Sequence, residues 1–251
     1  MSNVNRNPRS ISVVIPTYNE AGNVVPLIEQ IIAAVQDEYE LEVLVMDDSS
    51  PDGTADVARS RFSADPRVRV ITRTTDRGLG AAVGDGIRHA TGDSIVVLDA
   101  DLTHKPAQIS DLAHINQRFD LVSASRFAAG GSMQDRPHYV WSLVFNFWLR
   151  MILRTQVQDN LAGYYIVRRS LAQALPHEKI FFGYGDYFFR LLHFAKQAGG
   201  TIVEIPTHYT LRVAGDSKSN YLKMAGTYSA AAIRLLLSEI PRPGGRKSAK
   251  N

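Results

Sequence analysis

Short apolar runs bounded by turn residues recur along the first half of the chain, as is typical of buried β-strands. They cover residues 11–15, 41–46, 68–72, 94–98 and 121–124. Segments of helical length and apolar spacing lie between the first four runs, at residues 24–35, 54–62 and 81–90. This alternation predicts an α/β fold in which a mostly parallel sheet is covered by helices on both faces.

The second half of the chain has a different pattern. An aromatic-rich segment spans residues 139–153, and predicted strands at 164–167 and 201–205 precede a predicted helix at 221–237. In a helix, one broad face of the aromatic segment would carry Trp141, Phe145, Trp148 and Ile152. Asn146 and Arg150 interrupt the run, which favours a helix that lies along a membrane surface over one that crosses it. Packing into the core or a dimer interface is the alternative, and the pattern alone favours it.

Composition narrows the class of protein. The 251 residues suit one large domain, and 45% hydrophobic with 21% charged residues is ordinary for a globular chain. A formal net charge of +3 is too small to indicate nucleic-acid binding. There is no cysteine, so a metal ion would need oxygen or imidazole ligands. Neither a signal peptide nor an uninterrupted apolar run of about 18 residues is evident.

In parallel sheets, ligands bind beyond the carboxyl ends of the strands, so the residues that follow each apolar run are the candidates for chemistry. Asp99 and Asp101 follow the run at 94–98 and would present two carboxylates to one crevice. Their mutual repulsion suits a divalent cation that also binds diphosphate oxygens. A solvated loop, or acids at the start of a helix before Pro106, is an equally good interpretation of this fragment alone.

Other strand ends carry weaker signals. Asp48 could accept hydrogen bonds from a nucleoside, whereas Ser50 and Asp52 are explained by helix capping. Tyr18 and Glu20 could contact a nucleotide, although a turn that opens the next helix is the simpler interpretation.

Glycines and basic residues near these ends are also ambiguous. Gly78 and Gly80 would allow a ligand or another backbone to approach closely, but no dinucleotide or P-loop motif is present. Arg126, Arg136 and Arg212 could grip a phosphate with two hydrogen bonds, or could be surface charges. His104 could contact a metal ion or phosphate, or cap a helix.

The motifs become specific when they are taken together. In order along the chain they read PTYNE, VMDDSSPDGT, RGLGAAVGDGIRHATGD, LDADLTHKP, SASRF and RVAGDSKS. Over residues 11–218 this set resembles glycosyltransferase family 2, and within it the dolichyl-phosphate mannose synthases and related polyprenyl-phosphate glycosyltransferases. Thr103 stands where relatives often have Gln, and residues 159–164 match the family's Asp-x-x-Ser-Gly-Phe only loosely.

The resemblance implies a GT-A-type, Rossmann-like fold, a nucleotide-sugar donor, Mg²⁺ or Mn²⁺, and inversion at the anomeric carbon. It places Pro16, Tyr18, Glu20 and Asp48 on the nucleoside, and Asp99, Asp101 and Thr103 on the metal ion. Gly78 and Ala100 would line the substrate site. Phosphate contacts would come from Arg126, Arg136, Arg212, Ser217 and Lys218, and the catalytic residues would be Asp101, Arg126 and Arg212.

The organisation that follows is a flexible leader (1–9), a catalytic domain (10–218) with an acceptor loop and interface helix at about 130–156, a C-terminal helix (219–240) and a basic tail (241–251). The expected reaction moves a sugar, mannose from GDP-mannose in the first instance, to a dolichyl or polyprenyl phosphate. The expected location is the cytoplasmic face of a membrane, with a possible separate anchoring subunit. Three alternatives are a UDP-sugar donor, a hydroxyl acceptor with Asp186 as base, and a non-catalytic nucleotide-binding scaffold.

Overall fold

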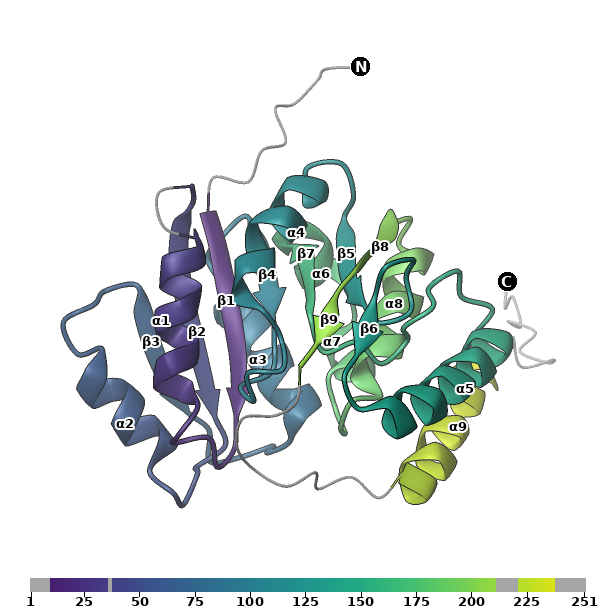
Figure 1. Ribbon diagram of the computed structural model, residues 1–251, viewed down its shortest axis with the longest axis horizontal. Coiled ribbons are helices and arrows are strands. Elements are labelled where there is room, and N and C mark those ends of the chain that lie inside the picture. The colour runs from purple at the N-terminus through teal and green to yellow at the C-terminus, as the bar shows by residue number, and fades with distance from the viewer. Residues whose placement is uncertain (1–9, 36–37, 211–220, 238–251) are drawn as a thin grey trace, which may run out of the picture.

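The computed structural model describes residues 10–35, 38–210 and 221–237 (Figure 1). Its main sheet has seven strands in the order β3-β2-β1-β4-β7-β5-β8. These strands are β1 (Ser10–Thr17), β2 (Glu40–Asp47), β3 (Val68–Thr72), β4 (Ser94–Val97), β5 (Leu121–Ser125), β7 (Tyr165–Arg168) and β8 (Ile202–Pro206). Only β7 runs antiparallel to its two neighbours, β4 and β5. The predicted mostly parallel sheet is therefore confirmed.

Helices cover both faces of this sheet (Figure 1). One face packs against α1 (Val24–Val35), α2 (Thr54–Arg61) and α4 (Ile109–Asn116), which follows the short 3₁₀ helix η1 (Pro106–Gln108). The other face packs against α3 (Leu79–His89), α6 (Arg169–Ala174), α7 (His177–Ile180) and α8 (Tyr187–Gln197). In β1, Val13 and Ile15 point to the first face and Val14 to the second, because successive side chains of a strand alternate.

A third apolar cluster lies beside the sheet, where the long helices α5 (Arg136–Leu153) and α9 (Tyr221–Leu237) pack on each other and on α8 (Figure 1). Leu149 and Leu153 of α5 meet Tyr228 and Leu235 of α9. A small second sheet pairs β6 (Ser132–Met133) with β9 (His208–Tyr209). Within the described residues, no helix has both the length and the hydropathy needed to span a membrane.

The helix α5 turns a different side outward from the one predicted. Phe145 and Ile152 pack against the cluster with α9, whereas Trp141 and Trp148 remain 65% and 51% exposed. The four residues therefore do not form one outward face, because the helix is apolar on nearly all sides and its pairing with α9 selects the buried side. Four other exposed apolar residues of α5 form a stripe with 4-3-4 spacing, here called the outer stripe: Val140, Val144, Phe147 and Met151.

Candidate active site

A large cavity of about 1980 Å³ opens beyond the carboxyl ends of the parallel strands. It brings together ten of the predicted site residues: Pro16, Tyr18, Glu20, Asp48, Gly78, Asp99, Ala100, Asp101, Thr103 and Arg126. Arg136 is exposed at the start of α5 and is not among the residues that line the cavity. Arg212, Ser217 and Lys218 lie outside the described residues.

The loop after β1 forms one end of the cavity. Tyr18 is 44% exposed there, and the guanidinium carbon of Arg77 lies 5.2 Å from the centre of its ring. The Glu20 carbonyl oxygen accepts hydrogen bonds from the backbone N–H groups of Asn23 and Val24, both at 2.9 Å, and so opens α1. The turn interpretation of this segment is therefore confirmed, and the same turn presents an exposed ring on which a nucleobase could stack.

Asp47, the last residue of β2, and Asp48, which follows it, have different structural roles. Asp47 is buried and accepts hydrogen bonds from the hydroxyls of Thr17 (3.1 Å) and Ser50 (2.6 Å), so it joins the loops after β1 and β2. Asp48 lines the cavity, forms a buried ion pair with Arg73, and accepts a hydrogen bond from the Gly78 N–H at 2.6 Å. Asp48 thereby fixes the start of α3 to the end of β2.

The glycines after β3 are explained by packing inside the protein. Gly78 has φ 135°, a conformation that L side chains rarely adopt. An added Cβ at Gly80 would lie 2.6 Å from the Phe182 carbonyl oxygen. The close approach expected here is therefore to the backbone of residues 182–183, which forms part of the cavity's surroundings.

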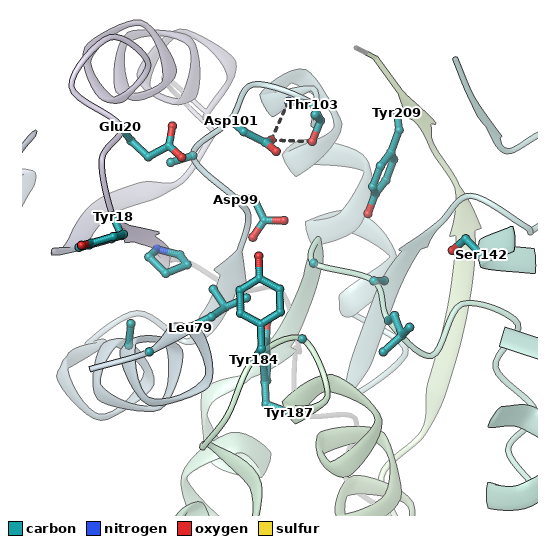
Figure 2. Close-up of a pocket in the computed structure, with 18 of the residues that line it drawn as sticks. Tyr18, Glu20, Leu79, Asp99, Asp101, Thr103, Ser142, Tyr184, Tyr187 and Tyr209 are labelled. Carbon is teal, nitrogen blue, oxygen red and sulfur yellow. Dashed lines mark hydrogen bonds between the residues drawn. The ribbon is translucent and has the colours of Figure 1, made fainter. Parts of the chain in front are cut away.

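The predicted metal-binding acids sit on the loop after β4 (Figure 2). Leu102 has φ 61°, and this turn lets the Thr103 N–H (3.1 Å) and hydroxyl (2.7 Å) both donate to Asp101 Oδ1. Asp101 is buried and held in place, whereas the Asp99 side chain is 40% exposed to the cavity. Carboxylate and hydroxyl oxygens are the ligand types that Mg²⁺ and Mn²⁺ prefer, so these residues fit such an ion.

Two carboxylates do not complete a metal site. In the part of the chain that the structure describes, no group of three or more His, Cys, Asp or Glu side chains is arranged to hold a metal ion. An ion bound at Asp99 and Asp101 would therefore take its remaining ligands from water and from a bound molecule. Diphosphate oxygens are well suited to that role, since Mg²⁺ in proteins is commonly held by one or two carboxylates plus substrate phosphates.

Arg126, at the end of β5, is held by an acid that the sequence analysis did not assign. Asp159 is fully buried and accepts hydrogen bonds from Arg126 Nε and Nη2, both at 2.7 Å. Burial alone would lower the pKa of Arg126, but the Asp159 carboxylate raises it above its ordinary value. The bidentate contact expected on a phosphate is thus made to Asp159. Among the described residues Nη1 has no hydrogen-bond partner, so it is the nitrogen that can face a ligand. A phosphate contact by Arg126 stays a prediction.

A chain of contacts links Arg126 to the helix α5. The backbone N–H groups of Gln158 and Asp159 donate to the Glu204 carboxylate at 2.6 and 2.8 Å. The next residue, Asn160, donates its N–H to the side-chain oxygen of Asn146 at 2.7 Å. Asn146 is buried, so this residue anchors α5 to the loop that carries Asp159.

The other end of the cavity is apolar, with walls from α5 and α9. Trp141, Val144, Phe145 and Trp148 line it from α5, and Ala225, Gly226, Tyr228 and Ser229 line it from α9. The Trp148 indole N–H donates to Ser229 Oγ at 3.1 Å, and Tyr228 Oη accepts from the Gly185 N–H at 3.1 Å. The first contact joins the two helices of the wall to each other, and the second joins α9 to the segment before α8.

Several cavity residues escaped the sequence analysis, among them Gly163, Tyr184, Tyr187 and Tyr209 (Figure 2). Burial raises the pKa of Tyr209 and Tyr187, so both phenols stay protonated and neutral. Only Gly163 carried a signal, through its place in the loosely matched motif at 159–164.

Asp186 is not placed as a base. It is buried, forms an ion pair with Arg190 at 2.5 Å, and accepts a hydrogen bond from the Tyr184 N–H at 2.9 Å. These contacts secure the start of α8. The structure thus gives Asp186 an organising role and leaves no free carboxylate at this position for proton removal.

Comparison with known proteins adds the family. A model described as Glycosyl transferase family 2 matches residues 12–175. The chain is 36% identical over 217 residues to the undecaprenyl-phosphate mannosyltransferase of Micrococcus luteus, with coverage of 83% of this chain and 86% of that protein. It is 33% identical over 215 residues to the dolichol-phosphate mannosyltransferase of Pyrococcus furiosus, where it covers 83% of this chain but only 58% of that longer protein.

Solved structures share the fold. Glucosyl-3-phosphoglycerate synthase from Mycobacterium tuberculosis, in complex with Mn²⁺, UDP and glucosyl-3-phosphoglycerate, matches with a TM-score of 0.69 and 24% identity over 94% of this chain and 82% of that one. Mannosyl-3-phosphoglycerate synthase from Rubrobacter xylanophilus also has a TM-score of 0.69, with 20% identity over 92% and 75% of the two chains. The expected GT-A-type fold is confirmed, and the family match together with the curated relatives identifies this chain as a glycosyltransferase of family 2.

Proposed function

We propose that the protein transfers mannose from GDP-mannose to a polyprenyl or dolichyl phosphate, with inversion at the anomeric carbon. The observation that carries this proposal is the cavity itself, whose lining combines two metal-suited carboxylates, Arg126 and a Trp-containing apolar wall. A phosphorylated isoprenoid suits the last two, because its anionic head can meet Arg126 and its apolar chain can meet the wall. The names of the two curated relatives support the same acceptor class and mannose as the sugar.

The reaction joins an acceptor phosphate oxygen to the anomeric carbon of the sugar. As that bond forms, the bond from the carbon to the donor diphosphate breaks, and its electron pair leaves with the nucleoside diphosphate. A phosphate monoester is already ionised near neutral pH, so no strong base is needed. The paired state of Asp186 agrees with this acceptor better than with a hydroxyl.

The two reacting groups are both anions, so the protein must reduce their repulsion. A divalent cation, Mg²⁺ or Mn²⁺, would supply positive charge on the donor diphosphate when bound at Asp99 and Asp101. Arg126, whose guanidinium is oriented by Asp159, would face the acceptor phosphate with Nη1. Tyr18 and Asp48 would contact the nucleoside at the far end.

A membrane surface would deliver the acceptor. Val140, Val144, Phe147 and Met151, the outer stripe, are all more than half exposed. Val144 also lines the cavity, so this surface is continuous with the apolar wall inside. An apolar helix face of this kind binds a bilayer in proportion to the area that it buries. Location on the cytoplasmic face and a separate anchoring subunit stay predictions.

The proposal is tested by incubating the protein with radiolabelled GDP-mannose or UDP-glucose, with Mn²⁺ or Mg²⁺, and with undecaprenyl phosphate, dolichyl phosphate or undecaprenol. We expect label from GDP-mannose to enter the organic phase only with the phosphorylated lipids. Transfer from UDP-glucose alone would establish the UDP-sugar alternative. Transfer to undecaprenol would overturn the proposed acceptor. Binding of the nucleotide sugar without any transfer would overturn the proposed activity.

A further inference from the structure

His104 lies directly after the metal-suited loop and is enclosed by aromatic rings. Its side chain has no exposed surface. The ring centre lies 5.0 Å from that of Tyr164 and 4.6 Å from that of Tyr209, the latter in an edge-to-face arrangement. Helix capping does not explain this position, since η1 has Lys105 at its N-cap and no side-chain cap hydrogen bond.

The two ring nitrogens of His104 are the feature that needs an explanation. Neither Nδ1 nor Nε2 forms a hydrogen bond with any residue that the structure describes. A buried polar group without a partner costs free energy, and folded proteins rarely keep one without a reason. A carboxylate oxygen lies close by, since Asp99 Oδ2 is 3.5 Å from Nε2.

The same oxygen of Asp99 is confined from a second direction. A Cβ added at Gly163 would lie 2.6 Å from Asp99 Oδ2 and 3.4 Å from Oδ1. Gly163 therefore leaves room for this carboxylate, with His104 beside it. Oδ2 is therefore the oxygen that both neighbours confine, and Oδ1 is the less confined of the two.

We propose that His104 is a positioning residue whose Nε2–H donates a hydrogen bond to Asp99 Oδ2 and thereby aims Oδ1 at the divalent cation. The two atoms lie 3.5 Å apart, so the proposed hydrogen bond requires them to approach by a few tenths of an ångström. Hydrogen bonds of this kind orient metal-binding carboxylates, and their loss typically lowers metal affinity about 10- to 100-fold. Direct ligation by His104 is disfavoured because an imidazole without exposed surface offers no free position to an ion in the cavity.

The inference rests on the proposed function only in requiring a divalent cation at Asp99. Its test is therefore a binding measurement that does not depend on sugar transfer. Mn²⁺ is titrated into the full-length protein, with and without GDP, and the free ion is followed by electron paramagnetic resonance. The variants are His104→Phe, which keeps an aromatic ring, His104→Gln, which keeps an N–H donor, and Tyr164→Phe as the matched control.

We expect His104→Phe to bind Mn²⁺ about 10-fold more weakly or worse, and His104→Gln to recover part of that loss. Tyr164→Phe should bind Mn²⁺ like the parent, because it alters the same aromatic cluster without removing the donor to Asp99. Equal affinity in the parent and a folded His104→Phe would overturn the proposal, and so would a parent that binds no Mn²⁺ with or without GDP. Normal Mn²⁺ binding without sugar transfer would reject the proposed function alone.

Two spectroscopic results test the geometry, and the first needs only the parent protein, so it holds even if the variants fail to fold. Long-range ¹H–¹⁵N spectra of histidine-labelled, Mg²⁺-loaded protein should show the Nε2–H tautomer for His104. An Nδ1–H tautomer would contradict the proposed hydrogen bond. A nitrogen coupling to bound Mn²⁺ that is lost in His104→Gln would show direct ligation and would also overturn it.

Discussion

At the scale of single residues, the two acids after β4 differ in how firmly the protein holds them. Asp101 already accepts two hydrogen bonds from Thr103, and Asn at this position could still accept at its side-chain oxygen. Asp101→Asn should therefore fold normally but lower the transfer rate about 10²-fold or more, because a preorganised charge is lost. Initial rates and circular dichroism check both parts. Full activity of this variant after EDTA treatment would reject a metal role for Asp101.

The pairing of Arg126 with Asp159 leads to a second expectation. Asp159→Asn leaves a buried guanidinium without its counter-charge, which typically costs about 3–5 kcal/mol. We expect the urea midpoint to fall accordingly, and the acceptor KM to rise more than the donor KM in any variant that stays folded. Asp56→Asn is the matched control, since Asp56 is an exposed acid on α2 and lies outside the cavity lining. A donor KM that rises more than the acceptor KM would contradict the placement of Arg126 at the acceptor.

The sequence identifies some residues of the site and misses others. Asp99, Asp101 and Asp48 could be predicted because each lies shortly after the end of an apolar run, and parallel strands end at the same edge. The partner of Arg126 could not, because Asp159 is 33 positions away and a loop residue gives no periodic signal. The surroundings of His104 escaped for the same reason, since Tyr209 belongs to a two-residue strand.

At the scale of elements, α5 shows why a helix can be predicted while its orientation cannot. Leu149 and Leu153 on its inner side are as apolar as Phe147 and Met151 on the outer stripe. Hydrophobic periodicity identifies a buried face only when the opposite face is polar. The choice of side is made by packing against α9 and by the hydrogen bond between Asn146 and Asn160, and the local pattern shows neither contact.

The outer stripe makes a prediction for membrane binding. Phe147→Ser combined with Met151→Ser removes apolar area that is exposed in the folded protein, so stability should change little while vesicle binding weakens. Co-sedimentation with anionic vesicles at low and high salt measures the effect. Val57→Ser on α2 is the control, because Val57 is also an exposed apolar residue, 41% accessible, on another helix. Equal sedimentation of the double variant and the control would mean that α5 is not the membrane contact.

The short helix α7 gives an expectation for pH. His177 Nε2 lies 3.0 Å from the Ala172 carbonyl oxygen, and burial lowers the pKa of His177 below its ordinary value of 6.5. The unfolded chain therefore binds more protons than the folded protein below about pH 6.5, and the free energy of unfolding should decrease as the pH falls through this range. His177→Gln keeps an N–H donor but does not titrate, so its decrease between pH 6.5 and 5 should be shallower. Urea unfolding at several pH values measures both, and equal slopes would contradict the assignment.

At the scale of the whole molecule, the sequence predicts the parts of the fold that depend on local patterns. It does not predict the parts that depend on contacts between segments far apart in the chain. The strands β1, β2, β3 and β4 alternate with helices along the chain. They are neighbours in the sheet, and a short run of apolar residues identifies each of them. The antiparallel β7, inserted between β4 and β5, and the pairing of β6 with β9 depend on contacts between distant segments. These same long-range pairings bring Arg126, Met133, residues 161–163 and Tyr209 to the cavity. This part of the cavity was therefore predicted less completely than the part formed at the ends of β1, β2 and β4.

The outer stripe and the acids Asp99 and Asp101 are expected to have separate functions. If the outer stripe only delivers the lipid, its loss should not affect chemistry at Asp99 and Asp101. The variant with Phe147→Ser and Met151→Ser should lose activity toward undecaprenyl phosphate in vesicles, yet keep near-parental activity toward soluble geranyl phosphate. Trp148→Ala should differ, because Trp148 lines the cavity and donates to Ser229, so its activity should fall with both acceptors. Parallel rate measurements with the two acceptors decide the question. Equal losses of the double variant on both acceptors would show that the stripe shapes the site itself and does not merely seat the enzyme on a membrane.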